Sequence, residues 1–142
     1  MRVGGETTMK PIISGQGQET ASPVRANRVR AWLNANAARF PGKPFIESIA
    51  QKRVATHGEM AALSAKLGHY LAARGIGAND RVVLLSGNSI EHLIVYLSVL
   101  AHGATICTVN VEMNHAYLGD LMAALDPRLV IDEEGLGLSL PE

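Results

Sequence analysis

The stretch that decides the fold runs from Thr56 to Ile131, and its centre reads RVVLLSGNSIEHLIVYLSVLAHGATICTV over residues 81–109. Within it, residues 81–85 carry apolar side chains at consecutive rather than alternate positions after Arg81, and residues 104–109 are expected to form another buried strand. A strand with this pattern is covered on both faces, as in a parallel sheet. A second run of this kind occupies residues 129–131. The stretch therefore predicts three buried parallel strands.

Helical patterns alternate with these strands. Thr56 and Glu59 have the spacing of a capping box, in which each side chain satisfies a free N–H group at a helix start. One face of the helix that follows carries the apolar residues Met60, Leu63, Leu67 and Leu71. Gly75 follows this helix at the position where a residue in the left-handed backbone conformation commonly ends a helix. Two more helices are expected over residues 89–102 and 115–125.

The order strand, helix, strand, helix, strand with short connections is typical of an α/β protein built on a doubly wound parallel sheet. An N-terminal helix is predicted ahead of it over residues 24–40, where apolar positions recur with helical spacing. Residues 45–49 and 53–56 predict a β-hairpin around a polar turn.

Composition divides the chain of 142 residues into three parts. Residues 1–23 are rich in Gly, Ser, Thr and Gln, which predicts a disordered leader. Residues 24–131 hold the α/β subdomain. Residues 132–142 form a weakly patterned tail, which we expect to be truncated. With 47% hydrophobic and 18% charged residues, the chain can build a packed core of one domain.

Composition also argues against several classes of protein. Lys and Arg number 13, as do Asp and Glu, so the chain lacks the positive charge of a nucleic-acid binder, and we expect no nucleic-acid partner. No apolar run reaches the ~20 residues that span a bilayer, so we expect no transmembrane segment. The N-terminus has no signal-peptide pattern, which favours the cytoplasm. The single cysteine, Cys107, lies in an apolar run and is expected to be a buried, reduced thiol.

The segment from Ile90 to Ala101 is unusual because its helix has almost no polar face. A helix that is apolar all round must be covered all round. One side can pack on the sheet, and we expect the other side to need a partner from outside the chain. The alternative is a compact three-layer domain in which other helices of the same chain cover it.

Few motifs of the sequence are candidates for a ligand or catalytic site. Gly75 and Gly77 follow a helix, whereas a dinucleotide fingerprint follows a strand, so they predict a helix stop and a turn. Residues 86–89, Ser-Gly-Asn-Ser, lie between a strand and a helix, where an anion could bind. Glu91 in the first turn would repel an anion, so plain capping is favoured. No two histidines have the spacing of a helical metal pair, and no serine is set in a nucleophile elbow.

The ordered motifs resemble the N-terminal region of the AMP-forming adenylate synthetases, the superfamily of acyl- and aryl-CoA ligases and luciferases. Residues 56–60 match the family's Thr-Tyr-x-Glu-Leu, with His57 where Tyr is usual. The other matching positions follow in the family's order: residues 39–41, 71–76, 80–82, 88–89, 100–104 and Asn110. Thr108 and Val111 stand where the family often has prolines. The resemblance covers roughly residues 24–131.

The resemblance implies a two-step reaction. A carboxylate attacks the α-phosphate of ATP to give an acyl-adenylate and pyrophosphate, and a thiol, usually coenzyme A, then displaces AMP. It also implies ATP, Mg²⁺ and coenzyme A for a full-length relative. The family's Ser/Thr/Gly-rich phosphate loop, its adenine-binding region and its catalytic Lys find no match in this sequence. We therefore assign no catalytic, cofactor-binding or metal-binding residue, and expect no cofactor bound by these residues alone.

Two hypotheses follow. The first is a fragment of an ATP-dependent carboxylate–CoA ligase that is inactive alone and is completed by the missing remainder of the ligase or by a complementing chain. The second is a non-enzymatic α/β interaction module that docks a partner through its apolar helix, residues 90–101. The first predicts that the remaining ligase region restores adenylation. The second predicts a stable oligomer without a link to ATP.

Overall fold

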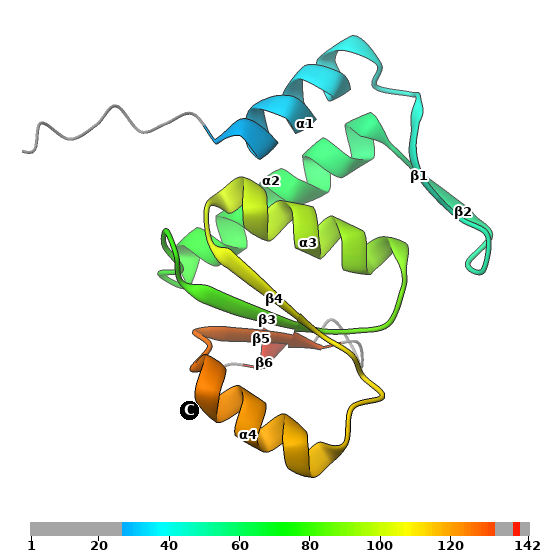
Figure 1. Cartoon of the computed structure of the whole chain (residues 1–142). Coiled ribbons are helices and arrows are strands. Elements are labelled where there is room, and N and C mark those ends of the chain that lie inside the picture. The colour runs from blue at the N-terminus through cyan, green and yellow to red at the C-terminus, as the bar shows by residue number, and fades with distance from the viewer. Residues whose placement is uncertain (1–26, 133–137, 140–142) are drawn as a thin grey trace, which may run out of the picture.

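A computed structural model describes residues 27–132 and 138–139 of the chain. It contains helices and strands in alternation after an N-terminal helix and hairpin (Figure 1). In chain order these are α1 (Arg28–Arg39), β1 (Pro44–Ser48), β2 (Arg53–Thr56), α2 (His57–Ala73), β3 (Arg81–Leu85), α3 (Ile90–His102), β4 (Thr105–Val109), α4 (His115–Leu125), β5 (Leu129–Asp132) and β6 (Leu138–Ser139).

The main sheet has the strand order β4-β3-β5-β6. Strand β3 pairs in parallel with β4 on one side and with β5 on the other, so that Val83 lies opposite both Cys107 and Val130. The three predicted strands and their parallel pairing are therefore confirmed, but β4 lies at the edge of the sheet and only its Val109 is buried, so its predicted burial was wrong. The structure adds β6, which pairs antiparallel with β5 through two residue pairs. Sequence missed this strand, because two residues in a weakly patterned tail carry no period.

The sheet lies between two layers of helix. Helices α1, α2 and α3 lie on one side of the sheet and α4 on the other (Figure 1). The core between α2, α3 and the sheet is made of buried apolar side chains, namely Leu71, Ile76, Val82, Leu84, Val95, Val99, Ala104, Leu129 and Ile131. Val83 points to the opposite face by strand alternation and is fully buried as well. Both faces are thus covered, as the consecutive apolar residues predicted.

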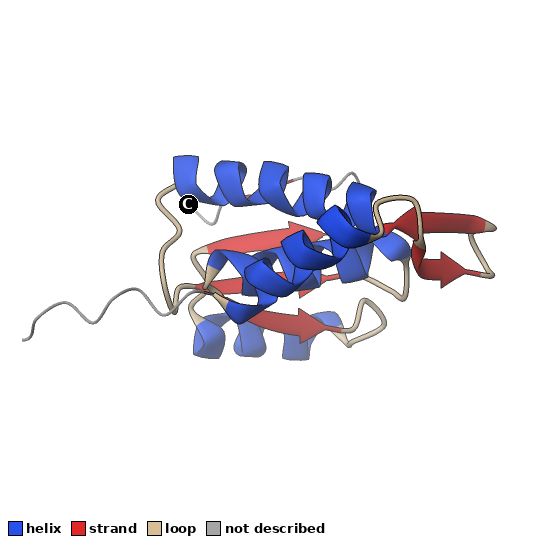
Figure 2. Ribbon diagram, turned by 90° about the horizontal axis from the view of Figure 1, so that it is seen from above, coloured by secondary structure: helices blue, strands red, loops and turns tan. Residues whose placement is uncertain are grey.

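A second apolar cluster joins α1 and the hairpin to the other side of α3. Its buried members are Leu33, Ala55, Met60, Ile90, Ile94 and Ala101. The hairpin β1-β2 itself forms a separate antiparallel sheet that extends beyond the end of the main sheet (Figure 2). Helix α3 therefore lies between two clusters, with Val95 and Val99 in one and Ile90 and Ile94 in the other.

This arrangement corrects the expectation that α3 needs a partner from outside the chain. Its apolar surface is divided between the sheet with α2 on one side and α1 with the hairpin on the other. Among the residues of α3, Leu93 alone is exposed, at 41%. The three-layer alternative is the one that the structure supports.

Smaller differences concern α1 and Cys107. The structure starts α1 at Arg28, and Asn27 caps it by accepting a hydrogen bond from the Arg30 N–H. The predicted helix began at residue 24, and residues 24–26 lie outside the described range. Cys107 is half-buried rather than buried, because β4 is an edge strand of the sheet. The expected leader, residues 1–23, and most of the tail also lie outside the described residues.

The predicted helix ends are confirmed. Thr56 Oγ1 accepts from the Glu59 N–H at 3.2 Å, and Glu59 Oε2 accepts from the Thr56 N–H at 2.8 Å, which completes the capping box. Gly75 and Gly103 follow α2 and α3 with φ of 70° and 97°. These left-handed conformations favour glycine, and they turn the chain toward β3 and β4.

Candidate functional site

The strand order creates a switch point at the carboxyl ends of β3 and β4. After β3 the chain turns to α3 on one side of the sheet, whereas after β4 it turns to α4 on the opposite side (Figure 1). The two loops separate and leave a crevice between neighbouring strand ends. In open α/β sheets, ligands bind in the crevice outside the carboxyl ends of the strands at such a point.

The structure has a crevice at this place, which we call the switch-point crevice. Its volume is about 540 Å³. The lining comes from the loop after β3, the first turn of α3 and the end of β4, and consists of Ser86, Gly87, Asn88, His92, Thr108, Val109, Asn110, Val111 and Glu112. Most of these side chains are polar, so the crevice offers hydrogen bonds rather than an apolar wall.

A serine–histidine pair lies in the β3 wall of the crevice. Ser86 Oγ is 2.7 Å from His92 Nδ1, a hydrogen-bond distance whose direction depends on the histidine tautomer. The His92 ring stacks on Tyr96, with ring centroids 6.5 Å apart and planes 11° apart. The stacking and the hydrogen bond hold the imidazole in one orientation. The pair can therefore present a fixed polar group to a ligand in the crevice.

The β4 wall is formed by a turn built on Asn110. Its side-chain oxygen accepts from the Glu112 N–H at 2.9 Å, and its main-chain carbonyl accepts from the Met113 N–H at 3.1 Å. This Asx-type turn directs the chain away from the sheet. Among the described residues of the lining, Glu112 is the one carboxylate and none is a Lys or Arg. Such a lining offers little compensation for the charge of a triphosphate.

The N-terminus of α3 is closed by side chains. Ser89 Oγ accepts from the His92 N–H at 3.0 Å, and Gln51 Oε1 accepts from the Ile90 N–H at 2.8 Å. Glu91 accepts from Gln51 Nε2 and pairs with Arg53. These hydrogen bonds, with that from Gln51 first, lower the pKa of Glu91. The favoured interpretation of residues 86–89 as a cap is confirmed, because the first N–H groups are already engaged.

The structure also bears on the glycine motif after α2 and on groups of side chains that could bind a metal. Gly77 N–H donates to Asp80 Oδ2 at 2.7 Å, so the segment after Gly75 is a turn, as predicted, and not a dinucleotide loop. Among the described residues, no three His, Cys, Asp or Glu side chains come together as a metal site. Sequence analysis missed the pair of Ser86 and His92. A spacing of six residues across a strand–helix turn fits no helical or strand period.

Comparison with known proteins identifies the family. The family model described as AMP-binding enzyme matches residues 33–139, which is most of the chain. The chain therefore belongs to the AMP-binding enzyme family, the AMP-forming ligase superfamily that the sequence motifs resemble. The fold agrees with the N-terminal subdomain of these enzymes.

Curated relatives are similar over one part of their length. Sulfoacetate–CoA ligase of Cupriavidus necator is 29% identical over 108 residues, which cover 76% of this chain and 21% of the relative. The 3-hydroxybenzoate–CoA ligase of Aromatoleum sp. is 28% identical over 119 residues, which cover 79% of this chain and 21% of the relative. The chain thus spans about a fifth of the length of these relatives.

A solved structure shares the fold. The N-terminal subdomain of Klebsiella oxytoca NpsA matches with a TM-score of 0.64 and 24% sequence identity, over 75% of this chain and 27% of that chain. At this identity the match shows a common fold alone. Within the described residues, no helix is long and apolar enough to cross a membrane.

Proposed function

We propose that this chain is the N-terminal subdomain of an ATP-dependent carboxylate–CoA ligase, and that it works only together with the remaining parts of that enzyme. The observation that carries the proposal is the family match over residues 33–139. The curated relatives above are CoA ligases of two different carboxylates, and the chain spans about a fifth of each. The substrate class is therefore a carboxylic acid.

The chemistry of the switch-point crevice supports the view that this chain and the remaining parts of the ligase bind different groups. Transfer to the α-phosphate of ATP needs Mg²⁺ and hydrogen-bond donors placed around the developing charge. The described residues that line the crevice include no Lys or Arg, and Glu112 adds negative charge to it. In our proposal ATP, Mg²⁺ and coenzyme A bind mainly to the remaining parts of the ligase. The Ser86–His92 pair then forms one polar wall of the assembled enzyme.

A chimera tests this proposal. The matching fifth of the Cupriavidus necator sulfoacetate–CoA ligase is replaced by residues 33–139 of this chain, and sulfoacetate-dependent ATP–pyrophosphate exchange is measured. We expect exchange above that of a control in which the segment is deleted from the ligase. The 142-residue chain alone is expected to give no exchange with any carboxylate of a panel, because the described residues that line the switch-point crevice include no Lys or Arg to bind the phosphates of ATP.

Two results would contradict the proposal. One is a folded chimera, shown by a cooperative melt, that has no exchange activity above the deletion control. The other is adenylation by the chain alone. A docking module acting through residues 90–101 receives no support from the burial of α3, in which Leu93 alone is exposed. We therefore put forward no second function.

A further inference from the structure

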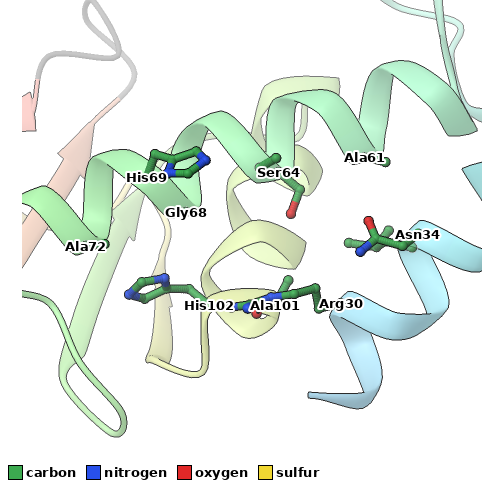
Figure 3. A pocket seen from close by; sticks show the side chains of 11 residues that line it. Arg30, Asn34, Ala61, Ser64, Gly68, His69, Ala72, Ala101 and His102 are labelled. Carbon is green, nitrogen blue, oxygen red and sulfur yellow. Dashed lines mark hydrogen bonds between the residues drawn. The ribbon is translucent and has the colours of Figure 1, made fainter. Parts of the chain in front are cut away.

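A second cavity lies at the other end of α3 from the switch-point crevice. It is enclosed by α1, α2 and the last turn of α3 and has a volume of about 330 Å³ (Figure 3). Helix α3 has 13 residues, so its two ends are about 20 Å apart. The helix cavity is therefore separate from the crevice and needs an explanation of its own.

The inner wall of the helix cavity carries a buried hydroxyl group. Ser64 is 8% exposed, and its hydroxyl points into the cavity (Figure 3). Ser64 Oγ makes no hydrogen bond to any other residue in the part of the chain that the structure describes. Among the described residues, only the Tyr70 hydroxyl is a fully buried polar atom without a partner, so solvent in the cavity still reaches the Ser64 hydroxyl. A ligand or water in the cavity would supply the missing partner.

Basic side chains line the cavity. Arg30 of α1 is a permanent cation, and the imidazoles of His69 and His102 lie on α2 and α3. Within the part of the chain that the structure describes, no Asp or Glu lines the cavity. This sign of charge favours an anion over a cation or a neutral ligand.

Arg30 and His102 are each held in place by a main-chain carbonyl. Arg30 Nε donates to the carbonyl of Ala101 at 2.9 Å. Its two terminal nitrogens make no hydrogen bond to a described residue and remain available as donors. His102 Nε2 lies 2.8 Å from the carbonyl of Ile76, so this nitrogen carries the hydrogen and Nδ1 lies on the other edge of the ring.

We propose that the helix cavity binds the anionic group of a small molecule, either a phosphate or a carboxylate. The terminal nitrogens of Arg30 bind the anionic oxygens at the open side, and the Ser64 hydroxyl donates to the same group or to its neighbour at the buried end. His69 and His102 line the cavity toward its Ala72 end (Figure 3). A guanidinium fork matches both kinds of anion, so the geometry defines the charge and size of the ligand and the experiment separates the two chemistries.

The test uses the full 142-residue chain labelled with ¹⁵N. Inorganic phosphate, acetate and succinate are titrated in parallel at constant ionic strength, with glycerol as a neutral control. We expect saturable shifts of the amide signals of Ser64, Gly68 and Ala101 with phosphate or with the carboxylates, and none with glycerol. Saturation by phosphate alone assigns a phosphate site, whereas saturation by the carboxylates alone assigns a carboxylate site.

Variants show which groups bind. Arg30→Gln is expected to weaken binding at least about tenfold, because the anion loses its charged partner. Ser64→Val removes the hydroxyl at similar volume and is expected to weaken binding about threefold or more. Arg28→Gln is the matched control, since Arg28 lies on the same helix outside the cavity lining and is expected to leave the affinity unchanged.

Three results would overturn the proposal. The first is an absence of saturable shifts at anion concentrations up to about 50 mM, which lie far above the dissociation constant of a useful site. The second is an equal loss of affinity in Arg28→Gln and Arg30→Gln, which would mean that the anion responds to general surface charge. The third is a spectrum of an unfolded chain, because the cavity exists only between packed helices. None of these results bears on the exchange activity of the chimera, which tests the ligase proposal independently.

Discussion

Gln51 and Ile90, 39 residues apart in sequence, are joined by a hydrogen bond of 2.8 Å from the main-chain N–H of Ile90 to the side-chain oxygen of Gln51. The same side chain donates to Glu91 at 2.7 Å. The turn of the β1-β2 hairpin therefore closes the N-terminus of α3, where the first N–H groups have no partner within the helix. Local helix capping here depends on a distant segment.

Replacing Gln51 by Ala is expected to lower the free energy of unfolding by about 1 kcal/mol, since a capping acceptor is lost. The urea unfolding midpoint measures the change. Glu47→Gln on the exposed side of the same hairpin is the control and is expected to stay within about 0.5 kcal/mol of the parent. Equal midpoints for Gln51→Ala and the control would mean that the cap contributes nothing.

The pKa of Glu91 and of Glu59 is lowered below the ordinary value of 4.5 by hydrogen bonds to the carboxylates. For Glu91 the donors are first Gln51, then its own main-chain N–H, and Arg53. For Glu59 they are the main chain and hydroxyl of Thr56. A carboxyl group whose pKa is lowered by folding stabilises the fold fully at pH values above its pKa in the unfolded chain. The stabilisation is lost as the pH falls through its pKa in the folded chain.

These two carboxylates should therefore leave the urea unfolding midpoint unchanged between pH 7 and about pH 5. At pH values under about 4.5 the midpoint should decrease, because the carboxylates take up protons. In Glu91→Gln, which cannot ionise at this position, the acid-induced fall is expected to be smaller. Urea unfolding of both proteins at each pH measures the difference. Parallel pH profiles for the two proteins would contradict the role assigned to Glu91.

Thr56→Ala removes the hydroxyl that accepts from the Glu59 N–H and is expected to lower the free energy of unfolding by about 1 kcal/mol. Thr56→Ser keeps the hydroxyl and should lose about 0.5 kcal/mol or less, because serine is an equally good cap. Thermal and urea unfolding compare the two variants. A loss in Thr56→Ser as large as in Thr56→Ala would show that packing of the methyl group matters more than the cap.

Gly103 and Gly119 differ in backbone conformation, so replacement by alanine is expected to have opposite effects at the two positions. Gly103 has φ of 97°, so Gly103→Ala forces a side chain into a left-handed conformation and should cost about 1–2 kcal/mol. Gly119 lies inside α4 with nothing near the position of a Cβ, and Gly119→Ala should stabilise the protein by up to about 1 kcal/mol. Unfolding midpoints measured side by side should move in opposite directions. Movement in the same direction would refute the conformational argument.

The hydroxyl of Tyr70 is buried and has no hydrogen-bond partner among the described residues, and burial raises the pKa of this phenol. Tyr70→Phe should therefore be neutral or stabilise the protein by up to about 1 kcal/mol. The ring contact with the Arg74 guanidinium, 4.4 Å from the ring centroid, is kept. Tyr117→Phe at an exposed site is the control. A clear destabilisation in Tyr70→Phe alone would reveal a partner of the hydroxyl.

Local signals allowed much of the fold to be predicted from the sequence. The capping box at Thr56, the left-handed glycines at 75 and 103 and the runs of apolar residues in β3 and β4 each depend on neighbours within a few residues. Their interpretation needs no knowledge of tertiary structure. The parallel sheet followed from them, because consecutive apolar residues must be covered on both faces.

The features that could not be predicted depend on distant residues. The apolar pattern of α3 shows that the helix must be covered, yet it does not show that Leu33 of α1 and Ala55 of the hairpin help to cover it. The pair of Ser86 and His92 needs the geometry of one particular turn. The Ser64 hydroxyl becomes notable only when the packing of three helices leaves it without a partner.

Helix α4 has a consequence for the motions of the chain. It covers one face of the sheet, yet none of its side chains is fully buried, and Tyr117 near its start is 60% exposed. Its last turn is fastened by Arg81 of β3, which donates to the carbonyl of Leu125 and lies 3.6 Å from the Asp126 carboxylate. Opening should thus begin at the N-terminal turn of α4 while β3 stays intact, so that hydrogen exchange decreases along α4 toward Leu125 and is slowest in β3.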